Sequence, residues 1–327
     1  MPSDLPPPIS SRNLAHVARP DGTFAPPQHP LIAKMPPGAA LISFRNISIG
    51  FDDREILHSV SFDVQHGETK VLLGESGTGK TLLMKMATGL IRPDTGSVLV
   101  MGKDVVAMSE AELLNFRREI GFVFQEGALF DSMTVAENVS FRLREESGEE
   151  EEIESRVRES LRFVEMEQAI DRYPAELSGG MRRRVSIARA LVDKPPIVFY
   201  DSPTAGLDPV TSQTIITLIL RGRDLQDVTS LLATHRVQDA FGLANYRFDT
   251  ASGLVRPLAK SKNNGGSDGR STLMEREKLA EGNKERNPAH PTTVLMLRDG
   301  KIYFEGPADS LLHSKDQYLK RFLASAE

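Results

Sequence analysis

The chain has 327 residues, of which 39% are hydrophobic and 26% charged, so it can bury a substantial core in one large domain or two. Its formal net charge of −5 gives no support to nucleic-acid binding, and the lack of cysteine excludes disulfides, thiolate metal sites and a cysteine nucleophile. No apolar run approaches the roughly 18 residues of a membrane-spanning helix, so we expect a soluble chain whose link to a membrane comes through a partner.

The N-terminal part of the chain changes character near residue 41. Residues 1–40 are rich in proline, serine and alanine without hydrophobic periodicity, which predicts a disordered arm. From Leu41, apolar and polar residues alternate over 42–49 and again over 60–64, with turn residues between the two runs. Alternation with a period of two predicts a pair of antiparallel strands.

The following stretch, to about residue 248, alternates short apolar runs with helical patterns. Ser109 and Glu112 stand in capping-box register at the start of one predicted helix. We expect strands over 70–73, 121–124, 196–200 and 230–233, and helices over 80–90, 109–118, 145–164, 181–193 and 211–223. Strands that alternate with helices indicate an α/β domain with a parallel sheet, here spanning residues 41–248.

The C-terminal part divides into two segments. Residues 249–291 carry a Gly-, Asn- and Ser-containing stretch and then many charges, which predicts a flexible insertion. Over 292–327 the order returns, with two apolar runs around an Arg-Asp-Gly-Lys turn and a final helical pattern. We expect this hairpin and helix to complete the domain that precedes the insertion.

A phosphate-binding loop follows the strand predicted over 70–73. The motif G-x-x-x-x-G-K-[ST] is matched at every fixed position by Gly74, Glu75, Ser76, Gly77, Thr78, Gly79, Lys80 and Thr81. Backbone N–H groups of such a loop and the helix N-terminus converge on phosphate oxygens. Lys80 is expected to reach the β- and γ-phosphates and Thr81 to bind Mg²⁺, with Asp201 at the end of another apolar strand as a second Mg²⁺ ligand. ATP and Mg²⁺ are therefore the expected cofactors.

A second motif narrows the family. The segment 177–181 resembles the LSGGQ signature of ABC ATPases, with Met181 where the family has glutamine; the signature residues are Ser178, Gly179, Gly180 and Met181. The resemblance covers about 41–248 and 292–312. It implies the P-loop NTPase core of an ABC ATPase, with an antiparallel β subdomain and a helical subdomain that bears the signature motif.

The same resemblance assigns further roles. Gln125 is similar to the Q-loop residue that senses Mg²⁺ and touches the membrane partner, and His235 to the switch histidine that contacts the γ-phosphate. Phe51 stands where the family stacks an aromatic ring on adenine. The D-loop, which crosses between protomers, is represented by Gly206, Leu207 and Asp208. In this family one protomer's phosphate loop and the other's signature enclose the ATP, so function implies a dimer, most simply a homodimer.

One position departs from the family pattern. After Asp201 the family has a glutamate that polarises the attacking water, whereas this chain has Ser202. A serine cannot act as a carboxylate base near neutral pH. Three hypotheses follow: a slow ATPase that relies on His235 and positioning, pairing with a different ATPase subunit, or a non-hydrolysing ATP-gated switch.

The segment 124–139 points to one branch of the family. It resembles the ATPases of Mla/Mce-type phospholipid transporters, as do the signature with its methionine, Arg183, Arg184 and the tail 318–323. This resemblance implies an MlaE-like permease, an Mce substrate-binding protein, phospholipid movement between bacterial membranes, and a cytoplasmic position on the inner membrane. The alternatives are an ABC ATPase of translation or DNA repair and a transporter of another substrate.

Overall fold

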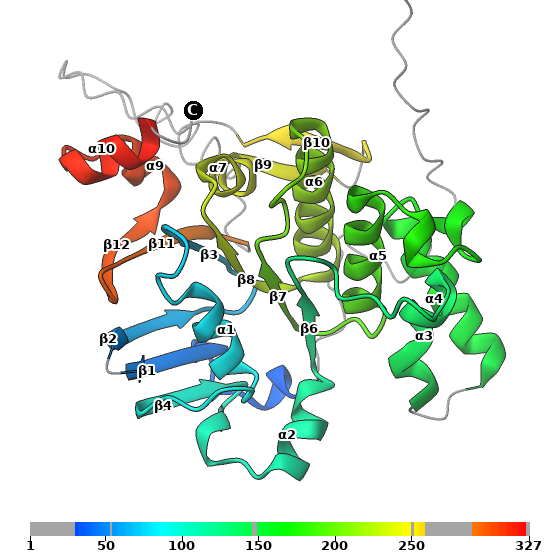
Figure 1. The fold of residues 1–327 in the computed structure, drawn as a ribbon, viewed down its shortest axis with the longest axis horizontal. Coiled ribbons are helices and arrows are strands. Elements are labelled where there is room, and N and C mark those ends of the chain that lie inside the picture. Colours follow the sequence, from blue (N-terminus) through cyan, green and yellow to red (C-terminus); the bar gives the residue numbers. More distant parts are fainter. Residues whose placement is uncertain (1–29, 53, 146–148, 250–251, 259–289, 325–327) are drawn as a thin grey trace, which may run out of the picture.

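A six-stranded, mainly parallel sheet forms the centre of the fold (Figure 1). The computed structural model describes residues 30–52, 54–145, 149–249, 252–258 and 290–324. The strand order is β12-β11-β3-β8-β7-β6, with β12 antiparallel to β11 and the other neighbours parallel. These strands are β3 (Thr69–Leu73), β6 (Ile120–Val123), β7 (Ile197–Asp201), β8 (Thr229–Thr234), β11 (Thr292–Arg298) and β12 (Lys301–Pro307). The predicted parallel α/β core is confirmed.

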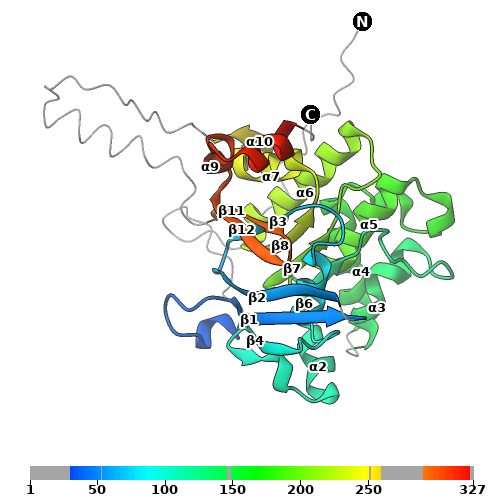
Figure 2. The ribbon, with the colours of Figure 1, turned by 60° about the vertical axis from the view of Figure 1, so that its left-hand side comes forward.

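A four-stranded antiparallel sheet lies below the parallel sheet in the view of Figure 2. Its order is β2-β1-β4-β5. Its members are β1 (Ile42–Phe51), β2 (Arg54–Val64), β4 (Thr95–Val100) and β5 (Lys103–Asp104). Phe44 and Phe62 face each other across β1 and β2, with ring centroids 4.5 Å apart. The alternation therefore correctly predicted two antiparallel strands. The buried side chains change parity once in each strand, at irregularities where Asn46 and Ser59 adopt positive φ.

Helices surround the two sheets. The α-helices are α1 (Lys80–Ala87), α2 (Glu110–Arg117), α3 (Val135–Glu145), α4 (Glu150–Phe163), α5 (Gly179–Leu191), α6 (Pro209–Gln226), α7 (Val237–Asn245), α9 (Ala308–Leu312) and α10 (Gln317–Ala324). Short 3-10 turns occur at η2 (Ile32–Lys34), η3 (Val105–Ala107), η4 (Glu167–Ala169) and η5 (Pro174–Glu176). The predicted capping box of Ser109 and Glu112 is present at the start of α2. In the described part of the chain no helix has the length and apolar content to cross a membrane.

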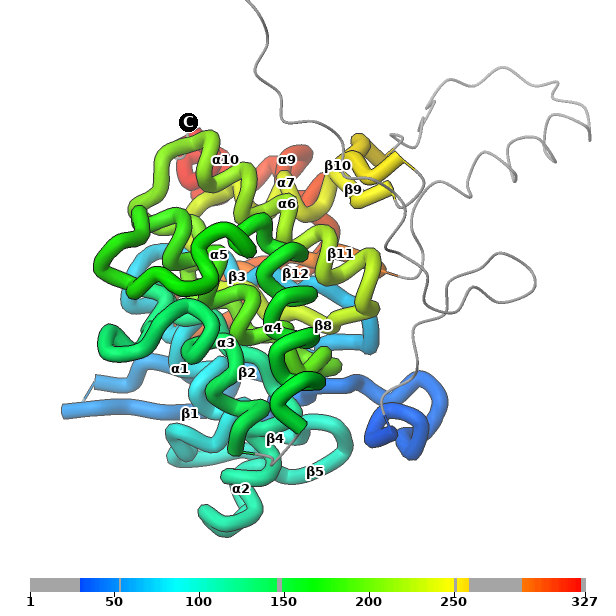
Figure 3. Tube along the Cα trace, turned by 90° about the vertical axis from the view of Figure 1, so that its right-hand side faces the viewer, coloured from blue at the N-terminus to red at the C-terminus, as the bar shows by residue number. Residues whose placement is uncertain are grey.

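Both faces of the parallel sheet are buried, and β7 illustrates how its residues alternate between them. Ile197 and Phe199 join the core shared with α1 and the antiparallel sheet. Val198 and Tyr200 join the core formed with α3 to α7, whose members α4 and α5 lie in front of the sheet in Figure 3. A strand buried on both faces reads as a continuous apolar run, as this one does.

Two predicted boundaries are wrong. Residues 30–40 of the expected arm are ordered, since Leu31, Ile32 and Met35 pack against the core beside the antiparallel sheet. Residues 254–257 of the expected insertion form β10 (Leu254–Pro257), which pairs with β9 (Tyr246–Asp249) as an antiparallel hairpin. The remaining parts of both predicted segments, 1–29 and 259–289, lie outside the described residues.

The C-terminal segment joins the domain through β11, which pairs in parallel with β3. Arg223 on α6 strengthens this junction: its guanidinium donates to the Leu243 carbonyl at 2.9 Å, the Tyr246 carbonyl at 3.0 Å and the Thr292 hydroxyl at 3.0 Å. Its ion partner Asp224 lies 2.7 Å away and is equally buried. A buried charge of this kind is stable only when all of its partners are in place.

Candidate nucleotide site

The candidate site lies where four parallel strands end at one edge of the central sheet. The loop 74–79 follows β3, His235 follows β8, Asp201 ends β7 and Gln125 follows β6. These strands are neighbours in the order β3-β8-β7-β6. In open α/β sheets ligands bind at the carboxyl ends of the strands, so the fold gathers residues that are far apart in the sequence.

The loop 74–79 leads directly into the N-terminus of α1. Gly79 has φ +95° and caps the helix, and a Cβ at this position would lie 2.6 Å from Leu57 Cδ2. Both the positive φ and the close approach require glycine. The N–H groups at the first turn of α1 therefore face the loop, which is the arrangement that binds phosphate.

The buried Lys80 ammonium is held by the loop itself. It donates to the Gly74 carbonyl at 2.9 Å, to the Glu75 carbonyl at 2.7 Å and to the Thr78 hydroxyl at 3.3 Å. Burial lowers the pKa of Lys80 to about 8, against the opposing attraction of Asp201 and Glu75. The lysine is thus charged at neutral pH, close to its titration point, and in place to exchange carbonyl partners for phosphate oxygens.

Thr81 and Asp201 form the expected pair of metal ligands. The Thr81 hydroxyl donates to Asp201 Oδ1 at 3.1 Å, and the carboxylate is largely buried. Hard oxygen ligands of this kind, completed by phosphate and water, suit Mg²⁺. The residues present therefore fit Mg²⁺, which Thr81 and Asp201 would hold and which would supply positive charge beside bound phosphates.

Ser202 occupies a tightly fixed backbone position beside this pair. Its φ is +47°, its N–H donates to the Ala233 carbonyl at 2.8 Å, and its hydroxyl lies 3.4 Å from Asp201 Oδ1. A hydroxyl at this distance can bind a water or the metal ligand, but it cannot accept a proton as a base.

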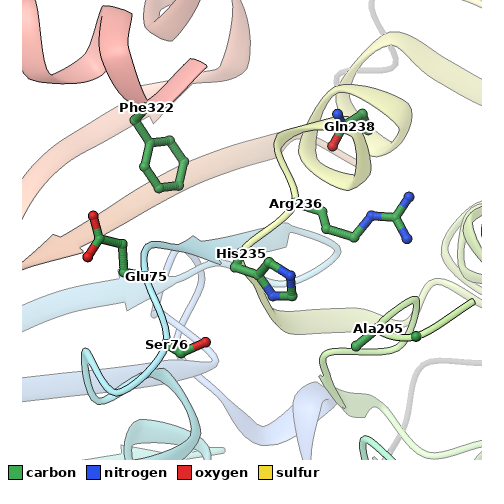
Figure 4. Close-up of a pocket in the computed structure, with 8 residues that line it drawn as sticks. Glu75, Ser76, Ala205, His235, Arg236, Gln238 and Phe322 are labelled. Atoms are coloured by element: carbon green, nitrogen blue, oxygen red, sulfur yellow. The ribbon is translucent and has the colours of Figure 1, made fainter. Parts of the chain in front are cut away.

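A cavity of about 580 Å³ opens beside the loop (Figure 4). Its lining includes the predicted residues Glu75, Ser76, Gly206 and His235. Four further residues line it without having been predicted: Ala205, Arg236, Gln238 and Phe322. In Figure 4 the Phe322 ring extends from α10 toward Glu75. The structure therefore brings part of the phosphate loop, the D-loop and the switch histidine to one cavity.

The signature turn packs against the D-loop region of its own chain. Ser178 caps α5 by accepting the Met181 N–H at 3.3 Å, so the helix begins at Gly179, two residues earlier than predicted. A Cβ on Gly180 would lie 2.4 Å from Thr211 Cγ2 on α6. Asp208 caps α6 through the Val210 and Thr211 N–H groups, each at 3.0 Å. All four signature residues lie outside the lining of the cavity that contains Glu75 and His235.

The remaining predicted residues are exposed or peripheral. Phe51 is 47% exposed at the tip of the β1–β2 hairpin, Gln125 is exposed after β6, and Leu207 is partly buried against the core. Exposure of an aromatic ring at a hairpin tip suits stacking on a base, which would bury both.

No role at the nucleotide site was predicted for Arg183, which entered only through the resemblance of this segment to Mla/Mce-type ATPases. It is buried, and its guanidinium donates to the Phe124 carbonyl at 3.0 Å and the Ser202 carbonyl at 3.5 Å. Burial lowers the pKa of Arg183, while Asp201 and Glu126 oppose the shift. One side chain of the signature helix thus fixes the backbone on both sides of the candidate catalytic centre.

Comparison with known proteins agrees with this geometry. A family model described as ABC transporter matches residues 57–205. The dimeric post-hydrolysis state of the ATP-binding cassette MJ0796, bound to ADP and Pi, superposes with a TM-score of 0.62 at 25% identity, covering 82% of this chain and 98% of that one. The structure of cbiO1 from Clostridium perfringens shares the fold with a TM-score of 0.65.

Curated relatives include proteins with several names. The probable ribonucleotide transport ATP-binding protein mkl of Mycobacterium leprae is 41% identical over 208 residues, covering 63% of this chain. This chain spans only 60% of the length of that relative. The intermembrane phospholipid transport system ATP-binding protein MlaF of Haemophilus influenzae is 34% identical over 216 residues, covering 66% of this chain and 82% of that protein. The chain belongs to the family of ABC transporter ATP-binding proteins.

Proposed function

We propose that the chain binds Mg-ATP and couples its hydrolysis to a separate membrane permease. The observation that carries the proposal is the convergence of Lys80, Thr81 and Asp201 at the N-terminus of α1. Lys80 would move from the loop carbonyls to the β- and γ-phosphates. Thr81 and Asp201 would hold Mg²⁺, which supplies charge neutralisation at the phosphates when bound.

Hydrolysis at this site would depend on positioning. Phosphoryl transfer is governed largely by electrostatic stabilisation and geometry, so a site without a carboxylate base retains part of its rate. His235 lines the cavity and is the predicted contact of the γ-phosphate. Ser202 also favours a second candidate function, in which ATP binding closes the protein and turnover is slow or absent.

A pair of chains is proposed as the functional unit. The signature turn of each chain is packed against its own α6 through Gly180 and Thr211. The signature residues lie outside the lining of the cavity that contains Glu75 and His235, so the N-terminus of this helix could meet a second chain's nucleotide. The related cassette MJ0796 is described as dimeric, which supports the same arrangement here.

The loop 127–134 offers a surface for the permease. Arg189 donates to the carbonyls of Gly127 at 2.9 Å and Ala128 at 2.8 Å. Asn138, fully buried, bonds to the backbone of Phe130: its side-chain carbonyl accepts the Phe130 N–H at 2.8 Å, and its side-chain amide donates to the Phe130 carbonyl at 3.1 Å.

Beside this fixed loop lies a groove of about 510 Å³, lined by Ser132, Met133, Glu137, Phe141, Arg144 and Glu145. Phe130 is 42% exposed, and we propose that a permease segment covers it.

Phospholipid is the proposed cargo. The Haemophilus relative is named as part of an intermembrane phospholipid transport system. A chloroplast protein of Arabidopsis thaliana named TRIGALACTOSYLDIACYLGLYCEROL 3 is 43% identical over 188 residues. Other relatives are named for ribonucleotide or for sulfate and thiosulfate. The phospholipid cargo therefore rests on the segment 124–139 and the name of the Haemophilus relative, while the Arabidopsis name refers to a galactolipid and supports lipid cargo in general. The proposal is completed by an MlaE-like integral-membrane permease and an Mce substrate-binding protein as partners, with this chain peripheral on the cytoplasmic face of the inner membrane.

The first experiment measures Mg-ATP turnover of the purified chain, alone and with its co-expressed permease, against a Lys80→Ala control. Turnover that requires Lys80 and rises with the permease supports the proposed motor. ATP binding without turnover in either state would favour the switch. Lipid extracted from the purified complex tests the cargo, since a complex that carries no phospholipid and transports sulfate or ribonucleotide across a membrane would refute lipid transport.

A further inference from the structure

A buried carboxylate lies behind the nucleotide cavity and was not part of the predicted site. Asp239, in the first turn of α7, is 2% exposed. Its Oδ2 accepts the Thr204 hydroxyl at 2.6 Å and the Thr234 hydroxyl at 2.7 Å. Both threonines are also fully buried. One carboxylate oxygen therefore joins the segment that follows β7 to the end of β8.

Arg236 closes the same network from the other side. Its guanidinium donates to the Thr204 carbonyl at 3.1 Å and to the Ser212 hydroxyl at 2.9 Å. Its backbone N–H donates to the Thr234 hydroxyl at 3.0 Å, and its Nε lies 4.0 Å from Asp239 Oδ1. The segment after β7, the end of β8 and the start of α6 and α7 are thus held by one set of polar contacts.

The two threonines adjoin residues that line the cavity. Thr234 immediately precedes His235, and Thr204 immediately precedes Ala205; His235 and Ala205 both line the cavity. Figure 4 shows His235 directed into the space between Ser76 and Ala205. A change in the Asp239 contacts would therefore shift both His235 and Ala205.

The free-energy cost of burying the Asp239 carboxylate favours a specific role for this residue over simple filling of space in the core. Burial raises the pKa of Asp239, while the hydroxyls of Thr204 and Thr234 and the charges of Arg236 and His235 oppose the shift. A buried carboxylate costs free energy that an apolar side chain of similar volume would avoid. What the carboxylate adds is orientation, because a fully satisfied polar network fixes one arrangement of its members.

We propose that Asp239 is a positioning residue that sets His235 relative to Ala205 and to Gly206 of the predicted D-loop in the nucleotide cavity. The inference rests on the proposed function, in which His235 contacts the γ-phosphate. Movement of His235 toward nucleotide is transmitted through Thr234, Asp239 and Thr204 to the D-loop. With serine at position 202, hydrolysis depends more strongly on this alignment, and a misplacement near 1 Å costs roughly 100-fold in rate.

The test compares Asp239→Ala with Asp239→Asn in the full chain with its permease. The amide oxygen of asparagine can still accept both hydroxyls, so Asp239→Asn should keep kcat within about threefold of wild type. Asp239→Ala should lower kcat by roughly 10- to 100-fold with KM for ATP nearly unchanged, since Lys80, Thr81 and Asp201 are untouched. Asp224→Ala is the matched control, because it removes a buried carboxylate remote from the cavity and should lower stability without lowering kcat.

A second readout does not require turnover. Amide hydrogen exchange should show that Mg-ATP protects both the phosphate loop and residues 202–208 in wild type, but only the phosphate loop in Asp239→Ala. If Asp239→Ala keeps wild-type kcat and wild-type protection of 202–208, the positioning role is refuted. A wild type that binds ATP without turnover would defeat the proposed hydrolysis alone, and the exchange experiment would still decide the role of Asp239.

Discussion

The substitution Ser202→Glu tests whether the missing carboxylate limits hydrolysis. The backbone should tolerate the change, because Ser202 already adopts φ +47° and glutamate adds no branching at Cβ. The N–H of residue 202 keeps its bond to the Ala233 carbonyl, so the new side chain starts from the same fixed point. Since the Ser202 hydroxyl lies 3.4 Å from Asp201 Oδ1, a longer side chain can pass the metal ligand toward the cavity.

The expected gain follows from two opposing effects. A positioned general base contributes about 10²- to 10⁴-fold in rate, which is about 3 to 5 kcal/mol of transition-state stabilisation. The Asp201 carboxylate opposes the new charge with roughly 2 to 3 kcal/mol if the two lie about 6 Å apart at an effective dielectric constant near 20. Mg²⁺ offsets this repulsion when nucleotide is bound. We therefore expect kcat to rise by roughly 100-fold or more, and the nucleotide-free protein to lose stability.

The assay is steady-state turnover of the complex with its permease, and the matched control is Ser202→Gln. Glutamine has the same length as glutamate but cannot act as a base, so it should leave kcat near the wild-type value. Equal rates for serine, glutamine and glutamate would show that position 202 does not limit hydrolysis. Equal gains for glutamine and glutamate would show that side-chain length, and not the carboxylate, acts there.

Three further predictions concern titration, stability and assembly. Since the pKa of Lys80 is about 8, ATP binding above that pH should require the lysine to take up a proton. The affinity for ATP should then fall by up to about tenfold for each unit of pH above 8. In Lys80→Met this pH dependence of the affinity should vanish. Arg223→Met should lower the unfolding free energy in urea by about 3 to 5 kcal/mol because it leaves Asp224 buried and unpaired, whereas Arg223→Met with Asp224→Leu should recover most of that loss. Asn138→Ala should release the loop 127–134, weakening co-purification with the permease while ATP affinity stays unchanged; wild-type recovery of the permease would refute docking at this loop.

The features that could be predicted from the sequence are those specified by residues that are neighbours along the chain. The phosphate loop, its strand and its helix are contiguous, and the glycine at position 79 is demanded by its own φ and by Leu57. Alternation within β1 and β2 reports burial of every second side chain on either side of one irregularity in each strand. These features need no knowledge of distant partners.

The features that escaped prediction depend on distant partners. The strand β4 begins Thr95-Gly96-Ser97, which resembles a turn, and its extended state comes from pairing with β1. Asp239 and Thr204 are 35 residues apart and belong to no periodic pattern. Phe322 reaches the cavity from a helix at the far end of the chain. Side-chain networks, and contacts made by helices near the C-terminal end of the described residues, can be recognised only when the positions of the sheet strands are known.

In the proposed pair, one chain supplies only part of the nucleotide site. Its signature residues lie outside the lining of the cavity that contains Glu75 and His235, so a second chain is the proposed source of the helix N-terminus that completes the site. Val210, 78% exposed beside the D-loop, is a further apolar surface that such a partner would cover. Turnover of the isolated chain should therefore rise with the square of protein concentration at low concentration, while ATP binding to the single chain rises linearly. A specific activity that does not change on dilution to nanomolar concentration would contradict a composite site.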